Sequence, residues 1–296
     1  MGVKSLPELP EVETVRLGLA PVMEGATFVR VEQRRPDLRT AFPPHFVRRL
    51  TGRRVVSLGR RAKYLLADLD EGSVLVMHLG MSGSFRIEAD GSSAMQGTYY
   101  HARTKLKAHD HVVFHMSSGV RVVFNDPRRF GLMDLVPRAD LDRSKLFAGL
   151  GIEPLGNELS AATLAAMMAG RQAPLKAVLM DQRKIAGLGN IYVCEALWRA
   201  RLSPDRKAGT LATRSGRPTA GAERLAVAIR EVLQDAIAVG GSSLRDHIRA
   251  TGEIGEFQHR FAVYDREGEP CPRGRGVIRR KVHSGRSTFY CPVCQR

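Results

Sequence analysis

The chain has 296 residues, and its 46 Lys and Arg outnumber its 30 Asp and Glu, which gives a formal net charge of +16 and a pI near 10.3. Hydrophobic residues make up 43 % of the chain. No apolar run approaches the roughly 18 residues of a membrane span, so the composition excludes both an integral membrane protein and a disordered chain. No apolar leader is visible, which predicts a cytoplasmic protein. The basic excess indicates a polyanion partner and favours nucleic acid over acidic lipid.

The first part of the chain predicts one helix followed by short strands. Pro10 suits a first helical turn, and the helix is expected to end at Pro21 and Gly25. Residues 28–135 consist of short β-type runs separated by Gly, Asp and Ser, which predicts an antiparallel sandwich or barrel. The polar stretch 89–107 predicts a surface loop.

The periodicity becomes helical after Pro137. Helices are expected to begin near Ser160, Pro174 and Asn190, and a longer one is expected over about 222–239. The last segment is too short to hold a core unless a metal ion crosslinks it. The whole pattern predicts an α+β protein with three parts: a β domain over 1–138, a helical domain over 139–256 and a terminal hairpin over 257–296.

Three of the four cysteines form a candidate metal site near the end of the chain. Cys271 precedes a β-like hairpin, and Cys291 and Cys294 follow it. The spacing of the last two lets both thiolates turn toward one zinc ion. The position that would complete a second such pair is Gly274, so only three thiolates are evident, and His283 near the hairpin tip is the nearest alternative ligand. The alternative is three reduced cysteines that are neighbours by chance.

Three segments carry groups that can hold nucleic acid. From Cys271 to the last residue there are six Arg and one Lys and no acidic residue, which is typical of a phosphate-facing surface. The turn NDPRRFG at 125–131 can insert its Phe between bases, or it can be a solvated Arg pair beside a core Phe. The segment GLGNIY at 187–192 places Asn190 at a helix N-terminus, where backbone amides can bind phosphate or simply cap the helix.

Six motifs together resemble the formamidopyrimidine-DNA glycosylase family, in its oxidised-purine branch. In chain order they are PELPEVET, RRAKY, HLGMSG, DPRRFG, GLGNIY and RSTFYCPVCQ, and they extend from Pro7 to Gln295. The resemblance implies an N-terminal helix plus antiparallel β-sandwich, a helix-two-turn-helix domain and a C-terminal zinc-finger hairpin. It also implies one structural Zn²⁺, a monomer, and double-stranded DNA containing oxidised purines such as 8-oxoguanine or formamidopyrimidines as the partner.

The resemblance also assigns roles to particular residues. Pro7 matches the nucleophile, and Glu8 matches the acid that assists opening of the sugar ring. The residues that match phosphate clamps around the reacting nucleotide are Lys63, His78, Asn190 and Arg286. The residues that match the group filling the void left by the extruded base are Met81, Arg128 and Phe130, with Arg129 beside them. Segment 240–256 resembles the loop that closes over the damaged base.

Two features depart from the family pattern. Residues 1–6 precede Pro7, and an internal proline nitrogen is an amide whose lone pair is delocalised and cannot attack a sugar. Because some Leu codons can serve as start codons, we expect translation to begin at Leu6 and removal of the initiator Met to expose Pro7. The second departure is Gly274, which predicts a weakened zinc site.

Three hypotheses remain open at this point. The first is a bifunctional enzyme that removes oxidised purines by Schiff-base chemistry and cleaves the strand by β,δ-elimination. The second is a non-catalytic protein that binds damaged DNA, if Pro7 is never exposed. The third is a generic basic zinc module for RNA or DNA, which would have no use for Glu8 or for the void-filling residues.

Overall fold

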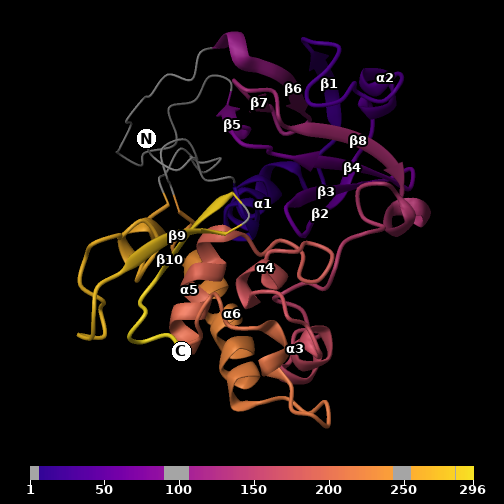
Figure 1. The fold of residues 1–296 in the computed structure, drawn as a ribbon. Helices are drawn as coiled ribbons and strands as arrows, with labels where there is room; N and C mark the ends of the chain where they lie inside the picture. The colour runs from indigo at the N-terminus through magenta and orange to yellow at the C-terminus, as the bar shows by residue number, and fades with distance from the viewer. Residues whose placement is uncertain (1–6, 90–106, 243–254, 284) are drawn as a thin grey trace. The chain divides into compact units, whose positions relative to one another are not determined.

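The structure is a computed structural model (Figure 1). It describes residues 7–89, 107–242, 255–283 and 285–296. The chain forms two compact units: one contains Lys4–Ala148 with Gly240–Glu256, and the other contains Gly149–Val239 with Phe257–Arg296. The division into three domains given above stays a prediction. The predicted surface loop between Ala89 and Lys107 lies outside the described residues.

Helix α1 (Leu9–Met23) opens the first unit, with Pro10 in its first turn as predicted. Gly25 follows the C-cap of the helix with φ +77°, as predicted, but the prediction that Pro21 ends the helix is wrong, because the helix continues through it. Proline lacks the backbone N–H and therefore removes one helical hydrogen bond. That loss falls in the last turn, where the Glu24 N–H still donates to the Ala20 carbonyl at 2.9 Å.

Two four-stranded antiparallel sheets complete the first unit, and they confirm the predicted antiparallel sandwich (Figure 1). The order in one sheet is β1-β6-β7-β5 and in the other β2-β3-β4-β8. The strand bounds are β1 Phe28–Gln33, β2 Val55–Arg61, β3 Tyr64–Leu69, β4 Ser73–His78, β5 Ser84–Ala89, β6 Asp110–Met116, β7 Val120–Asn125 and β8 Leu132–Pro137. Helix α2 (Phe46–Leu50) was not predicted, since a single turn leaves no periodic signal.

One apolar core joins both sheets to α1. Its fully buried members include Val15 of α1, Phe28 of β1, Leu65 of β3, Leu75 of β4 and Phe114 of β6. Because alternate side chains of each strand point to the same face, each sheet presents one apolar face to this core. The core therefore fixes where the strand ends and their connecting loops lie.

The described residues of the second unit form four α-helices and a β-hairpin: α3 Ala161–Met168, α4 Leu175–Leu179, α5 Asn190–Ala200, α6 Ala220–Ala238, β9 Arg279–His283 and β10 Arg286–Tyr290. Helix α5 packs against α6 and β10. The predicted cap of α3 is confirmed, because Ser160 Oγ accepts the Thr163 N–H at 3.0 Å. No helix among the described residues combines the length and the apolar character needed to cross a membrane.

Candidate active site and metal centre

The predicted nucleophile and acid lie at the buried start of α1. Pro7 is buried, and Glu8 is 3 % exposed and is the N-cap of the helix. Glu11 accepts the Glu8 N–H at Oε2 (2.9 Å), and its Oε1 accepts the backbone N–H (2.7 Å) and Oγ–H (2.9 Å) of Ser242. One carboxylate therefore joins the start of α1 to the first residues of the predicted closing loop. The rest of that loop, residues 243–254, lies outside the described residues.

Lys63 and His78 lie at one end of the β3–β4 pair. Tyr64 opposes His78 across the two strands, and their ring centroids are 4.8 Å apart. Burial lowers the pKa of His78 to about 4, and the positive charges of Lys63 and Arg39 act in the same direction. The imidazole is therefore neutral near pH 7. Its Nδ1 accepts the Gly80 N–H at 3.0 Å, so the ring proton is on Nε2, where it can be donated to a phosphate oxygen.

The two loops that carry the predicted void-filling residues pack directly on each other. Asp126 is fully buried and accepts a hydrogen bond from Ser82 Oγ at 2.5 Å. Gly80 has φ +63°, and a Cβ at this position would collide with the backbone of Phe130. Glycine is therefore required where the HLGMSG loop meets the DPRRFG loop. This contact places Met81 and Phe130 on one supported surface.

The arginines and Phe130 project from that surface. Phe130 is 41 % exposed, so it is not the core residue of the alternative interpretation. The Arg128 guanidinium lies 4.7 Å from the centroid of the Phe130 ring, in cation–π contact. Arg129 has a left-handed φ of 56° and lies 4.0 Å from Asp37. An exposed ring in contact with the Arg128 guanidinium can enter a stack of bases.

Asn190 and Arg286 are neighbours in the second unit. The buried side chain of Asn190, at the start of α5, donates to the Ser287 carbonyl at 2.9 Å. Lys176 Nζ donates to Asn190 Oδ1 and to Thr288 Oγ1, each at 2.6 Å. These hydrogen bonds hold Asn190 against the first residues of β10, where Arg286 is exposed. The start of α5 and the hairpin are thus joined by hydrogen bonds.

Sequence reasoning missed two cations at these sites. Lys176 is only 1 % exposed. The one hint of this burial in the sequence is its position among the apolar residues of the helix that follows Pro174. Arg39 acts on the pKa of His78, and its backbone N–H donates to the Gly131 carbonyl at 3.0 Å, at the end of the DPRRFG loop. Nothing distinguishes Arg39 within an arginine-rich stretch of sequence.

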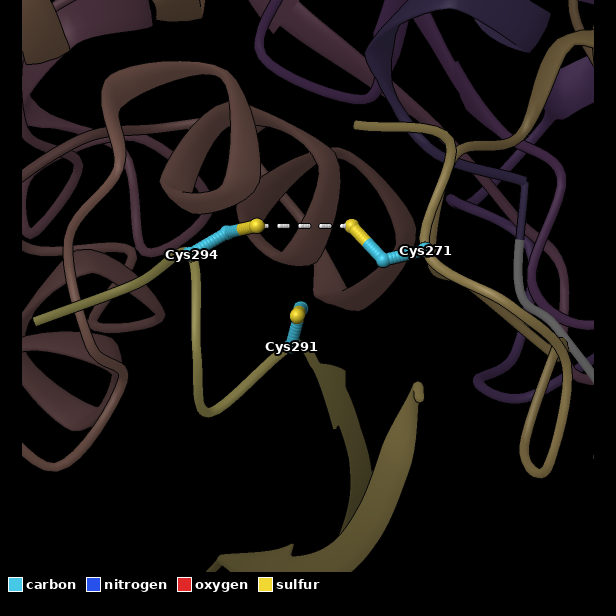
Figure 2. A group of neighbouring side chains, drawn as sticks. All are labelled: Cys271, Cys291 and Cys294. Atoms are coloured by element: carbon cyan, nitrogen blue, oxygen red, sulfur yellow. Dashed lines mark hydrogen bonds between the residues drawn. The ribbon is translucent and has the colours of Figure 1, made fainter. Parts of the chain in front are cut away.

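The three terminal cysteines converge as predicted. The sulfur atoms of Cys271, Cys291 and Cys294 all lie within 4.8 Å of one another, and Figure 2 shows the three side chains turned toward a common point. The Sγ atoms of Cys271 and Cys294 are 3.7 Å apart. Trp198 Nε1 donates to Cys271 Sγ at 3.4 Å, which favours a thiolate there. This donor set fits a zinc ion.

The fourth ligand position is not filled by His283. Its Nδ1 lies 2.8 Å from Thr288 Oγ1 and its Nε2 lies 2.7 Å from Asp205 Oδ1, so both ring nitrogens are engaged away from the cysteines. Gly274 has φ +69°, and a Cβ built there meets nothing within 4 Å. A side chain would therefore fit at Gly274, at the cost of a backbone conformation that favours glycine.

The fold and these two sites define a DNA glycosylase of the kind that combines a β-sandwich, a helix-two-turn-helix domain and a zinc finger. Three family models match the chain: the formamidopyrimidine-DNA glycosylase N-terminal domain over residues 6–133, its H2TH domain over 150–247, and the zinc finger found in FPG and IleRS over 268–296.

Relatives and solved structures agree with those matches. The formamidopyrimidine-DNA glycosylases of Chelativorans sp. and Beijerinckia indica are 61 % and 64 % identical, each over 98 % of this chain and 100 % of the relative. The MutM (Fpg) protein of Thermus thermophilus is 40 % identical with a TM-score of 0.80, over 98 % of both chains. The Lactococcus lactis Fpg in complex with DNA containing an abasic site is 30 % identical with a TM-score of 0.81, over 98 % of this chain and 100 % of that one. The chain therefore belongs to the formamidopyrimidine-DNA glycosylase family, which confirms the predicted resemblance.

Proposed function

We propose that the protein is a monomeric base-excision repair enzyme that removes oxidised purines, such as 8-oxoguanine and formamidopyrimidines, from double-stranded DNA and then cleaves the strand. The observation that carries this proposal is the start of α1, where Pro7 and Glu8 are both buried and Glu11 joins them to Ser242. A related structure supports the substrate class, because it holds a mutant Lactococcus lactis Fpg on DNA containing Fapy-dG.

The reaction follows from the chemistry of a secondary amine. With a free amine, the Pro7 nitrogen attacks C1′ of the damaged nucleotide, and the base leaves with its electron pair. Glu8, in its protonated form, donates to the ring oxygen as the sugar opens. The product is an iminium ion, whose electron withdrawal acidifies the C2′ proton. Loss of that proton expels the 3′ phosphate, and a second elimination expels the 5′ phosphate. This lyase step completes the proposed function.

The remaining predicted residues bind the DNA in this proposal. Lys63, His78, Asn190 and Arg286 hold phosphates around the reacting nucleotide, and Met81, Arg128 and Phe130 fill the space left by the extruded base, with Arg129 on a neighbouring phosphate. Extrusion costs a few kcal/mol, which inserted side chains offset. The exposed Phe130 ring and the Nε2–H of a neutral His78 support these roles.

The chemistry further requires that the active protein begin at Pro7. The family model starts its match at residue 6. This start supports translation from Leu6 followed by removal of the initiator Met, which leaves Pro7 with a secondary amine.

The phosphate-binding and void-filling roles differ in their dependence on salt. Arg286→Ala or Lys63→Ala is expected to lower the slope of log binding constant against log salt by about 0.9, since each removes one phosphate contact. Phe130→Ala is expected to slow base extrusion and to leave the slope unchanged, because its ring carries no charge. Binding of a lesion duplex at several salt concentrations, with base extrusion followed by fluorescence, measures both. A changed slope for Phe130→Ala, or an unchanged one for Arg286→Ala, would show that the roles are wrongly assigned.

We also propose that the three thiolates hold one structural zinc ion less firmly than four would. Bound zinc would supply a crosslink between the two ends of the terminal hairpin, and the cysteines hold it as thiolates. Gly274→Cys is expected to retain zinc longer against a chelator and to strengthen DNA binding. Gly274→Ala is the matched control, because it imposes the same backbone strain without adding a thiol. Absence of stoichiometric zinc from the native protein, or equal retention in the two variants, would contradict the three-thiolate site.

A further inference from the structure

The C-terminal end of α5 and the cysteine cluster border a pocket of about 580 Å³. Its walls contain Val293, Cys294 and four arginines, namely Arg201, Arg273, Arg275 and Arg296. None of these arginines has a role in the proposed chemistry, and all of them belong to one compact unit. The pocket is a separate feature that needs its own explanation.

One of the four arginines is held by the helix end. The Arg273 guanidinium lies 4.1 Å from the centroid of the Trp198 ring. It donates to the carbonyls of Trp198 at 2.7 Å and Arg199 at 3.1 Å. These carbonyls lie at the negative end of the α5 dipole, so Arg273 has a structural reason to be there.

The other three arginines are positioned through their backbones. Arg201 follows the last residue of α5 with a left-handed φ of 60°. Its carbonyl accepts the Arg296 N–H at 3.2 Å. The Arg275 carbonyl lies 3.1 Å from Cys291 Sγ and 3.4 Å from Cys294 Sγ. The backbone positions of the three arginines are therefore set by the helix end and the cysteine cluster.

In the described part of the chain, the negative groups nearest the pocket are the thiolates of the cysteine cluster, of which Cys294 lines the pocket. No Asp or Glu side chain lies within 4.0 Å of the four arginines there, and the side chains of Arg201, Arg275 and Arg296 make no hydrogen bond. Several positive groups around one volume repel each other unless an anion lies between them. Guanidinium groups suit phosphate in particular, because their planar donors bind two oxygens at once.

We propose that this pocket is a binding site for a multiply charged phosphate group, either successive phosphates of a DNA backbone or a free oligophosphate. Its volume and its number of arginines fit two adjacent phosphates better than one monovalent anion. The proposal is independent of base excision, since no residue of the pocket is assigned to that chemistry.

The test uses pyrophosphate and the full chain with its native metal content. Calorimetric titration at constant ionic strength is expected to show saturable binding to the unaltered protein, and binding at least about tenfold weaker to Arg275→Gln/Arg296→Gln. The matched control is Arg214→Gln/Arg217→Gln, which removes the same charge from an exposed loop of the same unit and should bind normally. Zinc content, measured in parallel, should be equal in all three proteins.

Competition with an undamaged duplex identifies the source of the phosphate. If the duplex displaces pyrophosphate from the unaltered protein, the pocket belongs to the DNA-binding surface; if both bind together, it takes a free oligophosphate. Absence of saturable pyrophosphate binding would overturn the proposal. An equal loss of binding in the two double variants would also overturn it, because it would mean that net charge alone is responsible.

Discussion

A protein that begins at Pro7 is expected to cleave a duplex containing 8-oxoguanine at least about 10³-fold faster than the 296-residue chain that retains residues 1–6, because loss of a covalent nucleophile removes most of the catalysis. The reason is the state of one nitrogen. At the chain start it is an amine with a pKa near 8, so a tenth or so is unprotonated at neutral pH. Behind Leu6 it is a planar amide. Strand cleavage by purified proteins of defined N-terminus, at equal concentration, measures the difference.

Binding separates this explanation from misfolding. Both proteins should bind a lesion duplex with similar affinity, since the predicted phosphate-binding and void-filling residues lie elsewhere in the chain. If the longer chain cleaves as fast as the shorter one while its N-terminus remains intact, Pro7 is not the nucleophile. If neither protein cleaves but both bind the lesion, the non-catalytic damaged-DNA-binding hypothesis is favoured.

Glu8→Gln, in the protein that begins at Pro7, is expected to reduce release of 8-oxoguanine by about 10²- to 10⁴-fold, the usual contribution of a positioned general acid. The amide keeps the shape of Glu8 and can still accept a hydrogen bond in the first helical turn, but it cannot give a proton to the sugar oxygen. A preformed abasic site already offers an open aldehyde. The rate of strand cleavage at such a site should therefore fall much less than the rate of base release. Comparison of the two substrates thus shows whether Glu8 acts as the proton donor.

The matched control for Glu8→Gln lies five residues along the same helix. Glu13 forms ion pairs with Arg16 (2.7 Å) and Arg60 (2.9 Å), which lower the pKa of its carboxyl group despite the opposing effect of burial. Glu13→Gln should cost some stability and leave the ratio of the two activities unchanged. An equal effect of both substitutions on base release would mean that Glu8 acts through the helix rather than on the sugar.

The sequence was most informative where the signal is local. Turn residues between short apolar runs predicted an antiparallel sandwich or barrel, of which the sandwich is observed, and Ser160 predicted the cap of α3. Pro21 misled because proline removes a hydrogen bond without preventing the last turn of a helix from forming. The single turn of α2 has too few residues to show a period.

The predicted sites could be recognised in the sequence, but their construction could not. Burial of Lys176 against Asn190 and Thr288 joins residues more than a hundred positions apart, and no local pattern encodes it. The need for glycine at Gly80 appears only when the backbone of Phe130 lies against it. The arginine pocket likewise combines the end of α5 with the terminal cysteines. The sequence indicated a phosphate-facing tail that contains Arg273, Arg275 and Arg296, but it did not indicate that Arg201 joins them.

Borohydride trapping with identification of the modified residue shows which group of the protein attacks the sugar. The protein that begins at Pro7 is incubated with a duplex containing an oxidised purine and reduced with borohydride, which converts an iminium ion into a stable amine. The covalent complex is then digested and the DNA-linked peptide is sequenced by mass spectrometry. We expect the sugar remnant to be attached to the nitrogen of Pro7; attachment to a lysine such as Lys63 would mean that Pro7 is not the nucleophile.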